Sequence, residues 1–147
     1  HHHGNFLRRL LDEDRVSEVH HLGLRETAGW DTLNAGTSAR SVGDLEVEDW
    51  PQDIAGKTCF VSLDVDVLDP SVLPATGTPV IGGLSLRQLC QVLALIAQVS
   101  KPVGLDIVEL CPIRDDSGLS ERSVIEALLC FLAVLHAKTS PQKSLQT

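Results

Sequence analysis

The chain lacks several features that would place it in large classes of protein. Its 147 residues contain no methionine, so we expect the sequence to be a piece of a longer protein. No apolar run reaches the ~18–20 residues of a membrane-spanning helix, and no basic segment leads into an apolar one as in a secretory signal. These absences predict a cytoplasmic protein without a membrane partner.

Basic residues are also scarce. The chain has 12 Lys and Arg residues against 20 Asp and Glu residues, which gives a formal net charge of −8. Nucleic-acid binding needs a basic surface that neutralises phosphates, so this charge argues against nucleic acid and suits a small cation or a metal. The cysteines form no Cys-x-x-Cys motif and three of them lie in apolar runs, so we expect buried free thiols in a reducing compartment. They are Cys59, Cys90, Cys111 and Cys130.

Periodic apolar residues predict alternating helices and strands. Helical spacing occurs over residues 4–14, 86–98 and 120–137. Apolar runs typical of strands occur over residues 16–24, 58–66 and 103–110. This alternation predicts an α/β fold with right-handed crossovers and a mainly parallel sheet.

Local signals refine these boundaries. Ser85 and Gln88 have the spacing of a capping box, and Ser120 is expected to cap the last helix. A polar helix or turn is expected near residues 35–43, and residues 138–147 are expected to form a disordered tail.

The most informative stretch is the strand at residues 58–66 and the loop after it. Asp64 and Asp66 would point to the same side of a strand. Pro70 cannot donate to a sheet, so the strand should end near Asp69. Two carboxylates at a buried strand end are unfavourable unless a cation or hydrogen bonds compensate them. The pattern alone leaves a divalent metal site and a pair of loop caps as alternatives.

The longer pattern resembles the arginase/agmatinase (ureohydrolase) family. It comprises the sequence SLDVDVLDP at residues 62–70, PATGTP at 74–79, GGLS at 82–85 and GLDIVELCP at 104–112. The resemblance implies a three-layer α/β/α fold with a doubly wound sheet. Residues 1–137 would be the C-terminal part of a single domain of this kind, incomplete in this chain.

The resemblance also implies an activity and a site. Family members of this type are manganese-dependent hydrolases that release urea from linear guanidino compounds, by attack of a metal-bridging hydroxide on the guanidinium carbon. By resemblance, Asp64 would bridge two manganese ions and Asp66 would bind one of them. Glu109 would pair with the guanidinium, Thr78 would face the substrate, and His3 would handle protons. The implied partners are a small cationic substrate and further copies of the chain.

Each of these residues also has a simpler interpretation. Without the motifs around them, Glu109 is a strand-end surface carboxylate, Thr78 is a turn residue and His3 belongs to a purification tag. His20 and His21 lie within a predicted strand and are expected to be structural.

Two alternatives to an active hydrolase remain open. The family's Gly-Gly-Asp-His and Asp-Ala-His-x-Asp motifs are absent, so the chain could be a catalytically incomplete fragment or a non-enzymatic subunit. The second alternative is a phosphatase of the haloacid-dehalogenase type, with Asp64 as nucleophile, Asp66 as acid, and Asp115 and Asp116 binding magnesium. The residue after Gly23-Leu-Arg25 is glutamate, so the resemblance does not single out arginine as the substrate.

Overall fold

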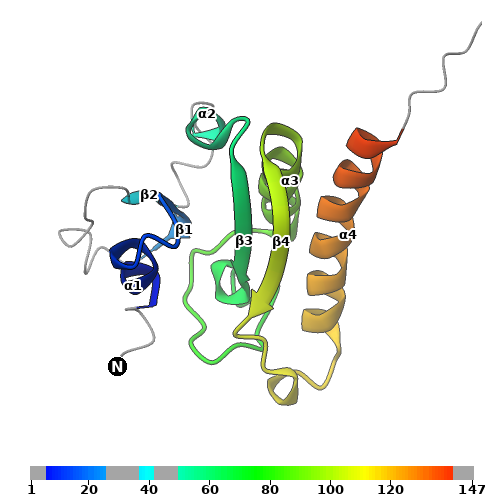
Figure 1. The fold of residues 1–147 in the computed structure, drawn as a ribbon. Helices are drawn as coiled ribbons and strands as arrows, with labels where there is room; N and C mark the ends of the chain where they lie inside the picture. Colours follow the sequence, from blue (N-terminus) through cyan, green and yellow to red (C-terminus); the bar gives the residue numbers. More distant parts are fainter. Residues whose placement is uncertain (1–5, 26–36, 42–49, 141–147) are drawn as a thin grey trace, which may run out of the picture. The chain divides into compact units, whose positions relative to one another are not determined.

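The structure, a computed structural model, describes residues 6–25, 37–41 and 50–140 (Figure 1). The chain divides into two compact units, residues 1–47 and 48–147, which are described separately. Within the described residues, no helix is both long enough and apolar enough to cross a membrane.

In its described residues, the first unit contains one helix and two parallel strands. They are α1 (Phe6–Asp12), β1 (Val19–Leu24) and β2 (Thr37–Ser41). Val19 of β1 is aligned with Thr37 of β2. The prediction of a polar helix or turn near residues 35–43 is wrong for the described part of that segment. The residues of this segment are polar and show no regular spacing of apolar side chains. They form a strand because they pair with β1, and the local sequence does not encode this pairing.

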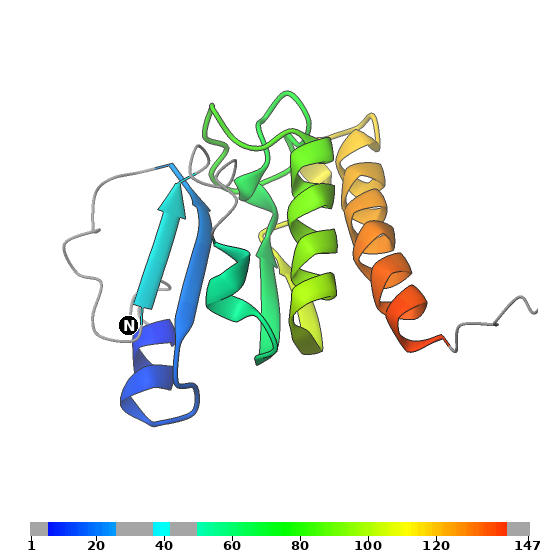
Figure 2. The same cartoon turned by 90° about the horizontal axis from the view of Figure 1, so that it is seen from above.

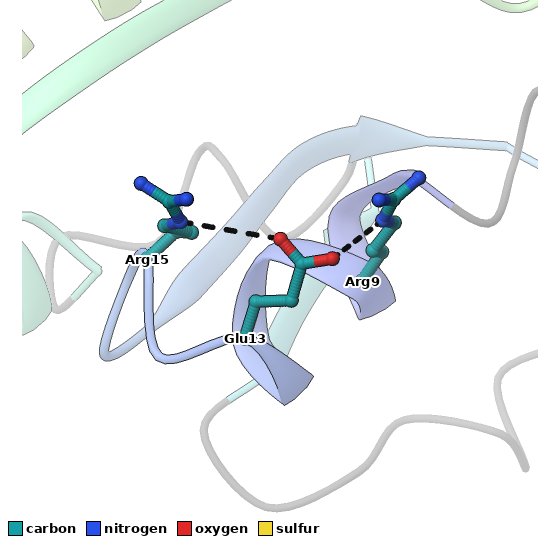
Figure 3. A network of polar contacts seen from close by, with 3 residues as sticks. All are labelled: Arg9, Glu13 and Arg15. Carbon is teal, nitrogen blue, oxygen red and sulfur yellow. Dashed lines mark hydrogen bonds and ion pairs between the residues drawn. The ribbon is translucent and has the colours of Figure 1, made fainter.

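An exposed charge cluster lies at the end of α1 (Figure 3). The Arg9 Nε donates to the Glu13 Oε1 at 2.6 Å, and the Arg15 Nε lies 3.9 Å from the Glu13 Oε2. Asp14 has a φ of 51°, which ends the helical turn. Exposed ion pairs of this kind contribute about 0–1 kcal/mol each, so they do little more than fix the local turn.

The second unit alternates helices and strands, as the sequence predicts. In chain order its elements are α2 (Pro51–Ile54), β3 (Thr58–Asp64), the 3-10 helix η4 (Val65–Val67), α3 (Leu86–Val99), β4 (Lys101–Val108), the 3-10 helix η5 (Pro112–Arg114) and α4 (Leu119–Thr139). Strands β3 and β4 are parallel, and Asp64 is aligned with Val108. The two strands therefore end at the same edge of the sheet.

Strand β4 starts earlier than expected. It begins at Lys101 and includes Pro102, which is aligned with Cys59 and is followed by a register shift. The missing N–H of proline is tolerated near the start of the strand, next to this irregularity. Two residues later, a Cβ atom on Gly104 would lie 2.7 Å from the ring of Phe60, so a larger residue there would displace this ring.

Helices α3 and α4 pack side by side next to the β3–β4 pair (Figures 1 and 2). The capping box of α3 is confirmed: the Gln88 N–H donates to the Ser85 Oγ at 3.3 Å, and the Ser85 N–H donates to the Gln88 Oε1 at 2.9 Å. Fully burying one large apolar side chain contributes about 1.5–3 kcal/mol. The buried apolar residues of the two helices are Leu89, Leu93, Ile96, Ala97, Val124, Ala127 and Phe131.

The end of α4 also supports α3. The Lys138 Nζ donates to the carbonyl oxygens of Ala97, Gln98 and Ser100 at 3.2, 2.9 and 2.6 Å. These carbonyls lie at the C-terminus of α3, where the helix leaves acceptors without internal partners. Lys138 and Thr139 are helical, so the predicted tail starts too early, while residues 141–147 lie outside the described residues.

One face of the β3–β4 pair carries exposed apolar side chains. Phe60 is 61% exposed and Val103 is 73% exposed, whereas the alternating residue Leu63 is buried. Alternate residues of a strand point to opposite faces. The second unit therefore covers one face of this sheet with its helices, and large apolar residues remain exposed on the strands.

Candidate active site at the ends of β3 and β4

The two predicted metal ligands lie at the end of β3. The strand ends at Asp64, and the next three residues form η4, so Asp66 is not on the strand as the sequence predicted. The Asp66 N–H donates to the Asp64 Oδ1 at 3.2 Å. The Asp64 carboxylate thus caps the 3-10 turn, and this local hydrogen bond ends the strand before Asp66. Asp64 is exposed and Asp66 is half-buried.

Glu109 follows directly after β4 and has an unusual backbone conformation. Its φ of 66° lies in the left-handed region, which is unfavourable for a residue with a Cβ atom. Such a conformation costs on the order of 1–3 kcal/mol and persists where the surrounding contacts impose it. Because Asp64 is aligned with Val108, Glu109 emerges at the same sheet edge as the two aspartates.

The loop at residues 74–78 is joined to the chain that follows Glu109. Thr76 forms an antiparallel bridge with Leu110, and the Cys111 N–H donates to the Ala75 carbonyl at 2.8 Å. A Cβ atom placed on Gly77 would lie 3.6 Å from the Glu109 Oε2, so the carboxylate of Glu109 lies against Gly77. The next residue, Thr78, is exposed. The structure therefore places the two predicted substrate-binding residues in adjoining segments.

Two further aspartates organise the loops, a role that was predicted for neither of them. Asp69 accepts hydrogen bonds from the Ser71 N–H at 2.9 Å, the Ser71 hydroxyl at 2.6 Å and the Gly82 N–H at 2.9 Å. The Ser71 hydroxyl bond, followed by these backbone N–H groups, lowers the pKa of Asp69 to about 2. This carboxylate closes the loop between residues 69 and 82.

Asp115 plays the corresponding part after β4. Its carboxylate accepts from the N–H and hydroxyl of Ser117 at 3.0 and 2.6 Å, and from the N–H and hydroxyl of Ser120 at 2.8 and 2.7 Å. The hydroxyl bonds from Ser117 and Ser120, followed by the Ser120 N–H, hold the pKa of Asp115 well below its usual range. The signal in both cases is the sequence Asp-x-Ser, which favours this local turn.

The prediction that Ser120 caps α4 is wrong. The N-cap is Gly118, with a φ of 70°, and Ser120 lies within the first turn of the helix. Asp115 reaches the Ser120 N–H from five residues upstream and so takes the role expected of the serine. Ser120 is free to make a different contact: its buried hydroxyl oxygen accepts from the Ala75 N–H at 3.2 Å.

The described residues do not make a complete metal centre. They contain no group of three or more His, Cys, Asp or Glu side chains that could hold an ion. Carboxylate oxygens suit manganese chemically, but Asp64 and Asp66 alone supply too few ligands to hold two ions. The predicted catalytic His3 lies outside the described residues.

His20, in β1, has hydrogen-bond partners within its own unit. The His20 Nδ1 lies 2.7 Å from the Ser38 Oγ, and its Nε2 lies 3.0 Å from the Glu18 Oε2. Burial, and then the neighbouring His20, lower the pKa of His21. The hydrogen bonds of His20 fit its expected structural role.

The four cysteines, all in the described residues, form no disulfide, as expected, although each is half-buried.

Comparison with known proteins assigns the chain to a family. The family model described as the arginase family matches residues 1–133. An agmatinase of Sodalis glossinidius is 32% identical over 143 residues, covering 92% of this chain and 46% of the relative. An N(1)-aminopropylagmatine ureohydrolase of Thermus thermophilus is 49% identical over 57 residues, covering 39% of this chain and 20% of the relative. The chain thus spans less than half the length of these curated relatives.

Solved structures agree on the fold. The proclavaminate amidino hydrolase of Streptomyces clavuligerus has a TM-score of 0.76 at 26% identity, covering 92% of this chain and 50% of that one. A hypothetical agmatinase of Burkholderia thailandensis has a TM-score of 0.78 at 21% identity, covering 95% of this chain and 46% of that one. The predicted arginase-like α/β fold is confirmed, and the match to the arginase family argues against the phosphatase alternative. The chain belongs to the arginase family.

Proposed function

We propose that the complete protein containing this chain hydrolyses a linear guanidino compound and releases urea. The observation that carries the proposal is the position of Glu109. Its carboxylate lies against Gly77 at the sheet edge where Asp64 and Asp66 also emerge, in a chain of the arginase family.

Glu109 would bind the guanidinium group. A planar guanidinium and a carboxylate can form two parallel charge-assisted hydrogen bonds, which are stronger than neutral ones. The left-handed backbone of Glu109 fixes the direction in which this side chain leaves the sheet. The hydroxyl of Thr78, one residue beyond Gly77, would contact the substrate from the facing loop.

Asp64 and Asp66 would contribute carboxylate ligands to a manganese site. The remaining ligands would come from residues outside those that the structure describes. Bound manganese would supply hydroxide at neutral pH, because the ion lowers the pKa of water. His3 would move protons to or from the reacting groups. Relatives named agmatinase, N(1)-aminopropylagmatine ureohydrolase and proclavaminate amidino hydrolase suggest a substrate with a guanidino group on a linear chain.

The second candidate is a fragment without activity of its own. It is favoured by the ligand count, because the described residues offer only two carboxylates at the proposed metal site. Exposed Phe60 and Val103 further suggest that the chain associates with other copies or with the remainder of its protein. Titration of the 147-residue chain with manganese, followed by calorimetry, should show no tight two-ion site, and light scattering should show association.

The proposed activity is tested on the complete gene product. Urea release is measured with added manganese from agmatine, arginine and guanidinobutyrate. Activity on at least one of them is expected, and the panel identifies the preferred substrate. Hydrolysis of phosphate esters with no release of urea would overturn the proposal.

A further inference from the structure

A hydrogen-bonded chain of groups connects the first turn of α4 to the loop beside Glu109. The Asp115 carboxylate accepts from the Ser120 hydroxyl at 2.7 Å, and the Ser120 hydroxyl oxygen accepts from the Ala75 N–H at 3.2 Å. Ser120 is fully buried, at 0% exposed. The connection spans 45 residues of sequence and therefore joins two segments that lie far apart along the chain.

Asp115 sets the direction of donation in this series of hydrogen bonds. A hydroxyl group has one hydrogen and two lone pairs. Because the hydrogen of Ser120 goes to a carboxylate that can only accept, the lone pairs are left for the Ala75 N–H. Asparagine at position 115 has one acceptor oxygen, so its NH2 group would face the N–H and hydroxyl of Ser117 or of Ser120 and could not accept from the N–H.

Ala75 in turn holds the residues that surround Glu109. Its carbonyl accepts from the Cys111 N–H at 2.8 Å, and the adjacent Thr76 bridges Leu110. Glu109 precedes Leu110, and Gly77 and Thr78 follow Thr76. A displacement of Ala75 would therefore move both the carboxylate of Glu109 and the loop against which it lies.

We propose that Asp115 and Ser120 are positioning residues that hold the loop at residues 75–78 and Glu109 in register for the guanidinium group. This inference rests on the proposed function, because it assigns the substrate contact to Glu109 and Thr78. The two residues act through Ala75 and do not themselves touch the substrate. Asp64 and Asp66 are held by the separate turn after β3, so the reacting end of the site keeps its geometry when the loop moves.

The kinetic test uses the complete protein with agmatine, or with whichever guanidino compound it hydrolyses. Asp115→Asn and Ser120→Ala should raise KM by about tenfold or more, because small displacements of substrate-positioning groups have large effects. The value of kcat should change less than about threefold, since uniform substrate binding is lost and the chemistry is not. General destabilisation of the fold would not produce this split.

Matched controls lie beside each variant. Asp116→Asn makes the same charge change at an exposed neighbouring residue. Ser123→Ala removes a hydroxyl that is equally buried on α4 but donates to the Val72 carbonyl at 3.4 Å instead of contacting Ala75. Both controls should leave KM within about twofold of wild type, the scatter expected for changes outside the site.

Amide hydrogen exchange provides a readout that needs no activity. Exchange at Ala75 and Cys111 should accelerate at least tenfold in Asp115→Asn and Ser120→Ala relative to Asp116→Asn and Ser123→Ala. Variants whose exchange and KM match those of the controls would overturn the proposal. A wild-type protein that hydrolyses no guanidino compound would overturn the proposed function and the catalytic part of this inference. Exchange would then still decide whether Asp115 and Ser120 hold the loop.

Discussion

The loops that follow β3 and β4 use the same local motif for different ends. In each, an aspartate accepts from the N–H and hydroxyl of the serine two residues later, Ser71 for Asp69 and Ser117 for Asp115. The second oxygen of each carboxylate has a different hydrogen-bond partner. That of Asp69 accepts from Gly82, thirteen residues away, whereas that of Asp115 accepts from Ser120 at the start of α4.

Because of this difference, the two loops are held to different parts of the chain. The bond from Gly82 closes the loop after β3 on itself, next to the proposed metal ligands. The bonds from Ser120 anchor the loop after β4 to a long helix and, through Ala75, to residues 75–78 in the middle of the loop after β3. A short Asp-x-Ser turn is thus a common local element, and its second oxygen determines which distant segment is held. The comparison predicts that changes at the β3 end impair chemistry, whereas changes at the β4 end impair binding.

The largest expected effect is that of Asp66→Asn at the β3 end. The change keeps the shape of the side chain and removes a charged ligand. Bound metal in the complete protein should fall, and activity should drop by more than the roughly 100-fold that loss of an outer-shell partner costs. Metal content by atomic absorption and urea release check this. Asp64→Asn should be at least as severe, and a fully metallated, active Asp66→Asn protein would mean that the pair is only structural.

At the β4 end, Glu109→Gln should weaken substrate binding. A hydrogen bond to a charged group is worth about 1.5–3 kcal/mol, which corresponds to roughly 10- to 150-fold in kcat/KM. The loss should appear mainly in KM, in contrast to Asp66→Asn. Glu109→Gly is the matched variant: it removes the carboxylate and also accepts a φ of 66° without strain. In thermal unfolding, Glu109→Gly should have a midpoint at least as high as that of Glu109→Gln. A lower midpoint for Glu109→Gly would contradict the backbone strain at this position.

Acid unfolding compares the two aspartates directly. The pKa of Asp69 is lowered from 3.8 to about 2, and that of Asp115 is lowered further. The unfolded chain therefore binds more protons than the folded one in this range, so the stabilisation is present above about pH 4 and is lost as the pH falls toward 2. Asp115→Asn and Asp69→Asn should lower the urea midpoint at pH 7 and flatten its decline between pH 4 and pH 2.

The asparagine variant at position 115 should show the stronger flattening of the two. Asp116→Asn, which changes the same charge at an exposed site, serves as the control. Equal pH profiles for all three variants would show that the hydrogen-bonded turns do not set the acid stability of either loop.

The smallest expected effect concerns Thr76, within the loop that Ala75 holds. Thr76 is 1% exposed, and its hydroxyl oxygen has no hydrogen-bond partner within the described part of the chain. A buried polar group without a partner costs about 1–3 kcal/mol. Thr76→Val should therefore leave the stability unchanged or raise it, as measured by thermal unfolding. A clear loss of stability would mean that the hydroxyl has a partner in the folded protein.

Several features of the site were predictable from the sequence. The capping box at Ser85, the order of Asp64, Asp66 and Glu109 along the chain, and the family itself depend on short, local patterns. Local hydrogen bonds join residues two or three apart, so their geometry is encoded in consecutive letters. The roles of Asp64, Asp66, Thr78 and Glu109 remain predictions, because the structure shows where they lie and not what they bind.

The tertiary structure decided the features that depend on distant partners. Strand β2 exists because β1 lies beside it, and Pro102 is accepted in β4 because the register shifts there. Asp66 lies outside the strand because its N–H donates to the Asp64 carboxylate. Glu109 has a left-handed backbone, and Ser120 accepts from Ala75 across 45 residues. The sequence by itself determined strands β3 and β4 and helices α3 and α4, because propensity and capping act within a few residues. Only folding decided which of these groups meet, because the partners of a buried hydroxyl or a strand edge are chosen by packing.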